Sequence, residues 1–212
     1  MIRNVLFDLG GVLIDLDIRR SLLAFDALKQ PGVELLSSQV TEDGLKGGHS
    51  SELMEAYQVG AITTRQFLDA LLSVCQPGTT DQQLIDAWFA MLLGIREDRK
   101  QLLRDLQSHG YNIYILSNIN ELHVGWTLAH CPEIKAAKGI FFSNEIHLSK
   151  PDPRCYELVL QQTGIQPEET LYIDDLLPNI EAGRQFGLQT LQAVGDEWIR
   201  DIRRKLRIEN DE

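Results

Sequence analysis

Residues 2–13 decide how the rest of the chain is interpreted, and they read Ile2-Arg3-Asn4-Val5-Leu6-Phe7-Asp8-Leu9-Gly10-Gly11-Val12-Leu13. The first half is a short apolar run, typical of a strand that is buried on both faces. The run ends at Asp8, and the glycine pair that follows favours a turn over a continued strand. We therefore expect a buried strand with a carboxylate at its C-terminal end.

Short apolar runs of the same kind recur after about residue 95, and helical segments separate them. The runs are Asn112–Leu116, Gly139–Phe142, Thr170–Ile173 and Leu188–Leu191. Glycine and proline mark the helices between them: residues 97–109 before Gly110, a helix that begins at Asp152-Pro153 and runs to Gly164, and one from Pro178 to Gly187. Strands alternating with helices through short loops must be parallel. The sequence predicts an α/β fold, a doubly wound parallel sheet with Rossmann-like crossover helices.

Residues 15–94 break this alternation. Helical spacing of apolar residues is found at Ile18–Lys29, Ser51–Gln58, Thr64–Cys75 and Asp81–Leu93, with no convincing strand among them. A connection between a strand and a helix usually has about 2–6 residues, so this segment is an insert. We predict an α/β catalytic core made of residues 1–14 and 95–212, and an all-helical cap domain made of residues 15–94. The cap follows the C-terminal end of the first strand, where ligands bind in open α/β sheets, and can therefore cover the site as a lid.

Composition limits the possible partners. The 212 residues are 43% hydrophobic and 24% charged, with a formal net charge of −11, so nucleic acid is an unsuitable partner. No run approaches the roughly 20 apolar residues of a membrane span, and the apolar run before Asp8 is too short for a signal peptide. The three cysteines are odd in number and widely spaced, which favours reduced thiols. We expect a cytoplasmic protein, a monomer or weak dimer, that acts on a small phosphorylated metabolite and binds no membrane.

Polar residues that can take part in catalysis or metal binding follow four of the predicted strands. They are Asp8 after the first, Ser117-Asn118 after the second, Lys150 in the loop after the third, and Asp174-Asp175 after the fourth. The carboxyl ends of parallel strands meet at one edge of a sheet, so these residues should converge. Two adjacent carboxylates at a strand end repel each other unless a cation lies between them.

This set of groups suits phosphoryl transfer. A carboxylate that attacks a phosphate ester is an anion approaching an anion, and a divalent metal can neutralise both. Carboxylate oxygens are the ligands that Mg²⁺ prefers, and Asp8 with the Asp174-Asp175 pair can supply them. Ser117 can hold phosphoryl oxygens, and Lys150 can offset the charge that develops during the reaction.

The four motifs, in this order, resemble those of the haloacid dehalogenase superfamily. They are Phe7-Asp8-Leu9-Gly10-Gly11-Val12-Leu13, Leu116-Ser117-Asn118, Ser149-Lys150-Pro151 and Ile173-Asp174-Asp175. The resemblance covers essentially the whole chain, and the insert is similar to the type 1 helical cap of that superfamily. The segments from Ser117 to His123 and from Asp175 to Gly183 are similar to those of small bacterial sugar-phosphate phosphatases, including those for alpha-D-glucose 1-phosphate.

The resemblance implies a role for each motif. Asp8 would be the nucleophile that forms an aspartyl-phosphate, and it would bind Mg²⁺ together with the backbone carbonyl of Gly10. Asp175 would be the principal acidic ligand of the metal and Asp174 the second. Ser117, Asn118 and Lys150 would bind the phosphoryl group, with Lys150 also assisting catalysis. Asn179 would orient a metal-bound water.

Gly10 departs from the pattern of many phosphatases and mutases of the superfamily. They carry a second aspartate at this position, which acts as general acid on the leaving alcohol. The metal ligand survives because it is a carbonyl, but the proton donor is lost, and such a donor is worth roughly 10²–10⁴-fold in rate. Without this donor the chain is poorly suited to be a mutase. We expect instead a phosphatase whose rate depends on the leaving group. Dehalogenases of the superfamily use no metal, so the acidic pair argues against them.

The residues that contact the substrate in the cap are less well defined. His49, Tyr57, Arg65 and Trp88 are candidates, although Tyr57 and Trp88 are more typical of the cap core and His49 of a solvated loop. Asp15 is a weaker candidate for a replacement acid. Two other functions stay open: a non-catalytic protein that binds a phosphate or sugar phosphate, and a receiver-type signalling domain. The receiver places its acidic pair after the first strand, unlike this chain.

Overall fold

A computed structural model of the protein describes residues 1–33 and 52–208. Its centre is a five-stranded parallel sheet in the order β5-β4-β1-β6-β7. The strands are β1 (Asn4–Phe7), β4 (Asn112–Ser117), β5 (Gly139–Phe142), β6 (Thr170–Asp174) and β7 (Gln189–Gln192). The predicted doubly wound sheet is confirmed, and its apolar strands lie where the short apolar runs predicted them.

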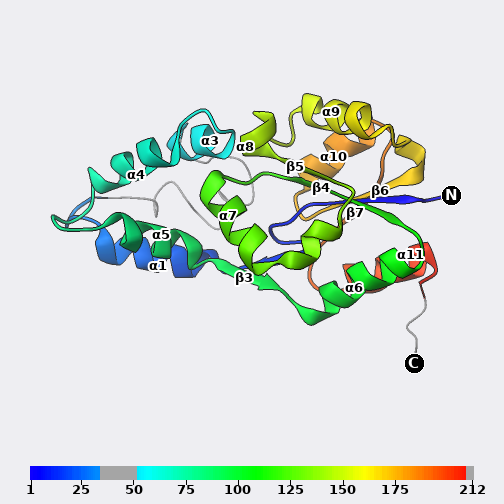
Figure 1. Cartoon of the computed structure of the whole chain (residues 1–212), viewed down its shortest axis with the longest axis horizontal. Helices are drawn as coiled ribbons and strands as arrows, with labels where there is room; N and C mark the ends of the chain where they lie inside the picture. Colours follow the sequence, from blue (N-terminus) through cyan, green and yellow to red (C-terminus); the bar gives the residue numbers. More distant parts are fainter. Residues whose placement is uncertain (34–51, 209–212) are drawn as a thin grey trace.

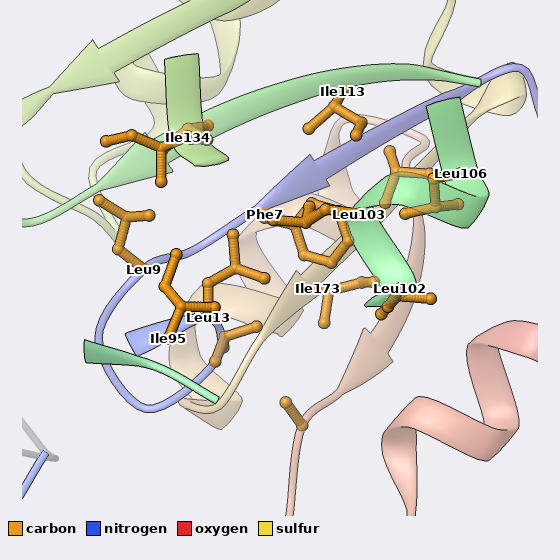
Figure 2. Close-up of a cluster of buried hydrophobic side chains, with 14 of the residues drawn as sticks. Phe7, Leu9, Leu13, Ile95, Leu102, Leu103, Leu106, Ile113, Ile134 and Ile173 are labelled. Atoms are coloured by element: carbon orange, nitrogen blue, oxygen red, sulfur yellow. The ribbon is translucent and has the colours of Figure 1, made fainter. Parts of the chain in front are cut away.

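Helices cover both faces of the sheet because alternate residues of each strand point to opposite sides. Val5 and Phe7 of β1 pack toward α6 (Glu97–Ser108) and α11 (Trp198–Leu206), in the core cluster drawn in part in Figure 2. Leu6 packs toward α9 (Pro153–Thr163) and α10 (Leu177–Gln185). Figure 1 shows α9 and α10 above the sheet and α6 and α11 below it. Two parallel-sheet faces buried by helices explain why the strands read as continuous apolar runs.

Two core helices were not predicted from the sequence. Helix α7 (Glu121–His130) follows β4, and α11 follows β7. A short helix, α8 (Ser143–Ile146), follows β5 and leads toward the loop that carries Lys150. Helix α7 places only part of its surface against the sheet core, because its other side contacts the insert; its apolar residues therefore lack a single clear face.

The insert is helical and has a core of its own. Its helices are α1 (Ile18–Leu28), α3 (Glu52–Gln58), α4 (Thr64–Leu72) and α5 (Asp81–Phe89). Phe25, Phe67 and Trp88 belong to a separate apolar cluster, in which the Trp88 ring lies 5.8 Å from that of Phe25 and 5.3 Å from that of Phe67, centroid to centroid. Figure 1 shows β1 running from the N-terminus toward these helices, so the carboxyl edge of the sheet faces the insert.

The expectation that residues 15–94 contain no strand is wrong at both ends of the segment. β2 (Ile14–Leu16) and β3 (Leu92–Ile95) pair as an antiparallel ribbon through which the chain enters and leaves the insert. The helix predicted to reach residue 93 therefore ends at Phe89. Strands of three and four residues are too short to show a period of two, and the sequence Leu92-Leu93 continues the apolar pattern of the helix before it.

Candidate active site

The carboxyl edge of the sheet brings the four sequence motifs together. Asp8 directly follows β1, Ser117 is the last residue of β4, and Asp174 is the last residue of β6. The Nζ atom of Lys150 lies 2.9 Å from Asp8 Oδ1 and 2.6 Å from Asp174 Oδ2. All four side chains are at least nine-tenths buried. One lysine thus links the first and fourth motifs inside the protein.

Asp174 is held by donors on both of its oxygens. Oδ2 accepts from Lys150 Nζ and from the Tyr172 hydroxyl, each at 2.6 Å. Oδ1 accepts from the Leu176 backbone amide and from Asn179 Nδ2, each at 2.9 Å. Burial favours the protonated form, but Lys150 and the other donors outweigh it and hold the pKa of Asp174 below its usual range. Asp174 is therefore an ionised, fully engaged carboxylate.

Asn118 holds the backbone of Lys150. Its Nδ2 donates to the Lys150 carbonyl and its Oδ1 accepts from the Lys150 amide, both at 2.8 Å. This reciprocal pair fastens the loop that carries Lys150 to the end of β4. The side chain predicted to bind the phosphoryl group is thus engaged in positioning the lysine.

The site holds more negative than positive charge. Carboxylate oxygens of Asp8, Asp174 and Asp175 lie within 4.8 Å of one another, with Lys150 as the cation between two of them. Burial, together with Asp174 and Asp175, raises the pKa of Asp8 to about 7 despite the opposing effect of Lys150. A further cation would offset this excess of charge. Buried carboxylate oxygens form the donor set that suits Mg²⁺, so the residues present fit such an ion.

Gly10 and Gly11 differ in whether their backbone positions can accept a side chain. Gly11 has a φ of +76°, and a Cβ there would lie 2.6 Å from Asp175 Oδ2, so only glycine fits beside that carboxylate. Gly10 does not have a positive φ, and among the described residues a Cβ there would meet only Leu16, with Cδ1 at 3.1 Å. The backbone therefore permits a side chain at Gly10.

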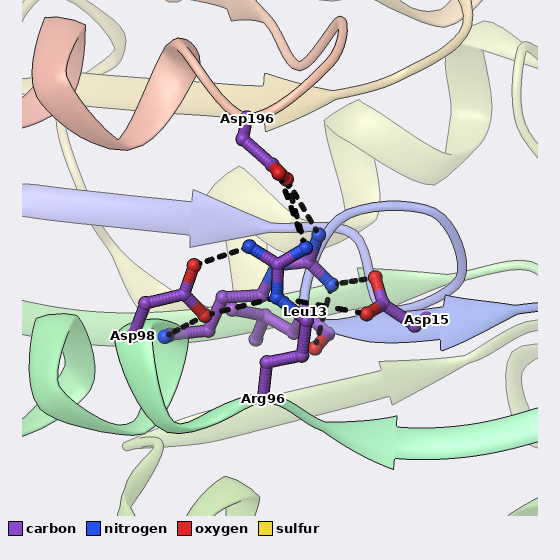
Figure 3. Close-up of polar contacts among 6 residues, drawn as sticks. Leu13, Asp15, Arg96, Asp98 and Asp196 are labelled. Atoms are coloured by element: carbon purple, nitrogen blue, oxygen red, sulfur yellow. Dashed lines mark hydrogen bonds and ion pairs between the residues drawn. The ribbon is translucent and has the colours of Figure 1, made fainter.

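Asp15 is committed to an ion-pair network on β2. Its carboxylate pairs with the guanidinium of Arg99, whose side chain is 4% exposed. Arg96 lies beside them, with Nη2 2.5 Å from Asp98 Oδ2 and Nη1 3.1 Å from Asp196 Oδ1. Figure 3 shows these carboxylates gathered around the guanidinium groups at the base of the ribbon. Asp15 is held by arginine here, so the structure gives no support to a role as replacement acid.

The candidate cap residues have structural partners. The Tyr57 ring stacks on Phe67 with centroids 4.2 Å apart, and Trp88 Nε1 donates to Asn120 Oδ1 at 3.3 Å. Arg65 pairs with Asp69 and Asp81 on the surface. His49 lies outside the described residues.

Sequence reasoning missed Tyr172 beside the site and the burial of His123 where α7 contacts the insert. Tyr172 contacts Asp174 directly, and the alternation of strand residues could have found it, because residues 172 and 174 of β6 share a face. His123 is buried, stacks on Trp88 at 5.0 Å, and places Nε2 3.2 Å from the Trp88 carbonyl; no spacing signal marks it. Burial lowers the pKa of His123 to about 4, so this imidazole is neutral.

The family model for haloacid dehalogenase-like hydrolases matches residues 2–187. The chain belongs to this family. The resemblance seen in the four motifs is confirmed, and with it the interpretation of the chain as an enzyme, a hydrolase. Within the described residues, no helix combines the length and the apolar character that a membrane crossing requires.

Relatives within the family carry out more than one reaction. D-ribitol-5-phosphate phosphatase from Bacteroides thetaiotaomicron is 23% identical over 95% of this chain and 97% of its own length. (S)-2-haloacid dehalogenase 1 from a Pseudomonas species is 28% identical over 90% of this chain and 84% of its own. A family enzyme from B. thetaiotaomicron, solved with magnesium and inorganic phosphate, superposes with a TM-score of 0.80 at 29% identity, covering 92% of this chain and 97% of that chain.

Proposed function

We propose that this haloacid dehalogenase-like hydrolase is a magnesium-dependent phosphatase that hydrolyses a small phosphate monoester, with sugar phosphates as the preferred class. The observation that carries the proposal is the bridge made by Lys150 between Asp8 and Asp174, beside the third carboxylate of Asp175. A buried lysine and three carboxylates at one sheet edge provide a nucleophile, a fixed cation and ligands for a metal.

Asp8 is the nucleophile in this proposal. One of its oxygens attacks the phosphorus atom, the ester bond to the alcohol breaks, and an aspartyl-phosphate forms on Asp8. Water then hydrolyses that acyl phosphate and restores the carboxylate. Ser117 binds phosphoryl oxygens from the end of β4, and Lys150 stabilises the charge on the transferring group.

The metal would be held by Asp8, the carbonyl of Gly10 and Asp175, and it would neutralise the charge of the phosphate and of the attacking carboxylate. Asp175 is the stronger candidate of the acidic pair, since four protein donors already engage both oxygens of Asp174. We assign Asp174 to holding Lys150, with metal binding as its secondary role. Asn179, predicted to orient a water, donates to Asp174 instead.

The relatives support a phosphorylated small molecule as substrate. D-ribitol-5-phosphate phosphatase aligns over nearly its whole length, and another relative is a phosphoglycolate phosphatase from Pseudomonas putida, 24% identical over 88% of this chain. The acidic pair favours these over the dehalogenase relatives, because two adjacent carboxylates call for a cation.

The proposal is tested with an activated aryl phosphate and with a panel of sugar phosphates, each in Mg²⁺ and in excess EDTA. We expect turnover only with Mg²⁺ and loss of at least about 99% of kcat in Asp8→Asn, since the amide is a far poorer nucleophile. An Asp8→Asn variant that retains more than a few per cent of kcat would show that another group attacks the phosphorus.

Two other outcomes would redirect the assignment. Hydrolysis of a 2-haloacid that persists in EDTA would place the chain with the dehalogenase relatives. Binding of a sugar phosphate by calorimetry without turnover of any ester would indicate a non-catalytic binding protein, the alternative that the loss of an acid at Gly10 leaves open.

A further inference from the structure

Tyr172 contacts the site from within the sheet. It lies two residues before Asp174 on β6, its side chain is fully buried, and its hydroxyl donates to Asp174 Oδ2 at 2.6 Å. The same carboxylate oxygen accepts from Lys150 Nζ at 2.6 Å. Hydrogen bonds to an ionised carboxylate are about twice as strong as bonds between neutral groups.

We propose that Tyr172 is a positioning residue: by holding Asp174 Oδ2, its hydroxyl keeps Lys150 placed between Asp174 and the nucleophile Asp8. The inference rests on the proposed function for its effect on turnover. Tyr172 touches neither the substrate nor the reacting atoms and acts through Asp174 alone.

The lysine needs such a constraint because its own side chain supplies none. An ammonium group is a compact charge on a flexible stem, so its position is set by its partners. Lys150 divides its charge between Asp174 at 2.6 Å and Asp8 at 2.9 Å. Without the tyrosine hydroxyl, Asp174 Oδ2 would lose one of its two donors and could turn, and Lys150, as the remaining donor, would follow it. Its charge would then lie farther from Asp8 and from the phosphoryl group that Asp8 attacks.

The tyrosine is itself held firmly. Its ring packs edge-on against Tyr156, with centroids 5.6 Å apart and planes at 77°. On the other side α10 passes so closely that a Cβ at Gly183 would lie 2.7 Å from Tyr172 Cδ1. The ring therefore has little freedom to move, and the hydroxyl is directed at Asp174 by the packing of the core.

A competing interpretation is that the hydroxyl is only the polar end of a core tyrosine that must find an acceptor. Tyr111 provides a matched control. Its hydroxyl also donates within the protein, to the Leu206 carbonyl at 2.8 Å, but Tyr111 packs against α11 in a different cluster and has no contact with the site. Tyr172→Phe and Tyr111→Phe each remove one hydroxyl and keep the ring.

The test compares kcat, KM and Tm of both variants with those of the wild type, using an aryl phosphate at saturating Mg²⁺. We expect Tyr172→Phe to lower kcat about tenfold or more with little change in KM, because losing the charge-assisted bond to Asp174 displaces Lys150, the group that stabilises the reacting phosphoryl. Tyr111→Phe should keep the wild-type kcat while changing Tm by about as much as Tyr172→Phe does, since each variant loses one hydroxyl hydrogen bond. Equal kcat in the two variants would overturn the inference.

A crystal structure of Tyr172→Phe decides the matter independently of turnover. We expect the distance from Lys150 Nζ to Asp8 Oδ1 to lengthen beyond hydrogen-bonding range, and an unmoved lysine would overturn the inference. A wild-type protein that hydrolyses no ester would defeat the proposed function alone, since the position of Lys150 can still be read from the crystal.

Discussion

At the scale of the residue, the site is a set of charges with one cation among three carboxylates. Lys150 is engaged by Asp8 and Asp174, and both oxygens of Asp174 are engaged by four donors. Desolvation by burial would lower the pKa of Lys150, but the adjacent carboxylates of Asp174 and Asp8 outweigh it and hold that pKa above its ordinary value. Gly10, the departure from the superfamily pattern that removes the general acid, carries no side chain.

Gly10 leads to a prediction about leaving groups. Without a side-chain acid, the alcohol must depart with little protonation, so kcat/KM should fall steeply as the pKa of the leaving alcohol rises. Gly10→Asp should improve alkyl phosphates by about tenfold or more and aryl phosphates much less, since general acid help matters most for poor leaving groups. The variant should fold, because the added Cβ meets only Leu16, a flexible and partly exposed side chain.

Gly10→Asn is the matched control for this series, because it adds a side chain of the same shape that cannot supply a carboxyl proton. The measurement is the slope of log kcat/KM against leaving-group pKa for the wild type and both variants. A flat slope in the wild type, with fast turnover of an alkyl phosphate, would show that another residue or the substrate itself supplies the proton.

At the scale of the element, the insert contacts the core along a seam as well as through the β2–β3 ribbon. The Gln58 carbonyl, at the end of α3, accepts from Ser143 Oγ at 2.7 Å, and the Val59 carbonyl lies 3.0 Å from His147 Nδ1. Next to them, a Cβ at Gly60 would lie 2.4 Å from the Asn144 carbonyl oxygen. The turn after α3 therefore fits against α8 only because residue 60 is glycine.

This fit predicts that Gly60→Ala weakens the seam. Gly60 and Gly78 both have positive φ values, of 66° and 90°, so alanine is strained at either position. No described atom lies within 4 Å of a Cβ at Gly78, whereas the one at Gly60 overlaps the backbone of Asn144. The free energy of unfolding should fall by about 1–3 kcal/mol more for Gly60→Ala than for Gly78→Ala, the usual cost of overpacking. Equal losses in urea denaturation would show that α3 can shift away from α8 without cost.

At the scale of the whole molecule, a helical body with its own core lies over the carboxyl edge of an α/β body (Figure 1). The division at residues 14/15 and 94/95 falls inside the β2–β3 ribbon, whose base is tied to the core by Asp15 and Arg99. We propose that these two bodies are a core and a cap, joined by the ribbon as a hinge and by the seam along α7 and α8.

We predict that the insert moves relative to the core when the site binds its ligands, since inter-domain motion is the default for a lid joined by two short connections. Spin labels at Leu23→Cys on α1 of the insert and at Val194→Cys on the surface of the α/β body report that motion. Both native side chains are exposed, and the three native cysteines are buried. The distance distribution should become shorter and narrower when Mg²⁺ and orthovanadate are added.

Labels at Leu128→Cys and Val194→Cys, both in the core, form the control pair and should give the same distance under both conditions. The same narrow distribution for the Leu23 and Val194 pair with and without ligands would contradict a moving cap.

The sequence by itself determined the parallel sheet, the helical insert and the four motifs, because each depends on local signals: apolar runs, helix-terminating glycines, and the order of polar residues along the chain. Only the tertiary structure engaged both oxygens of Asp174, committed Asp15 to Arg99, and brought Tyr172 to the carboxylate that holds Lys150. Those contacts join residues whose relation depends on the direction of each side chain and on which strands are neighbours. The β2–β3 ribbon also formed by pairing across the whole insert, between strands too short to carry a period of their own.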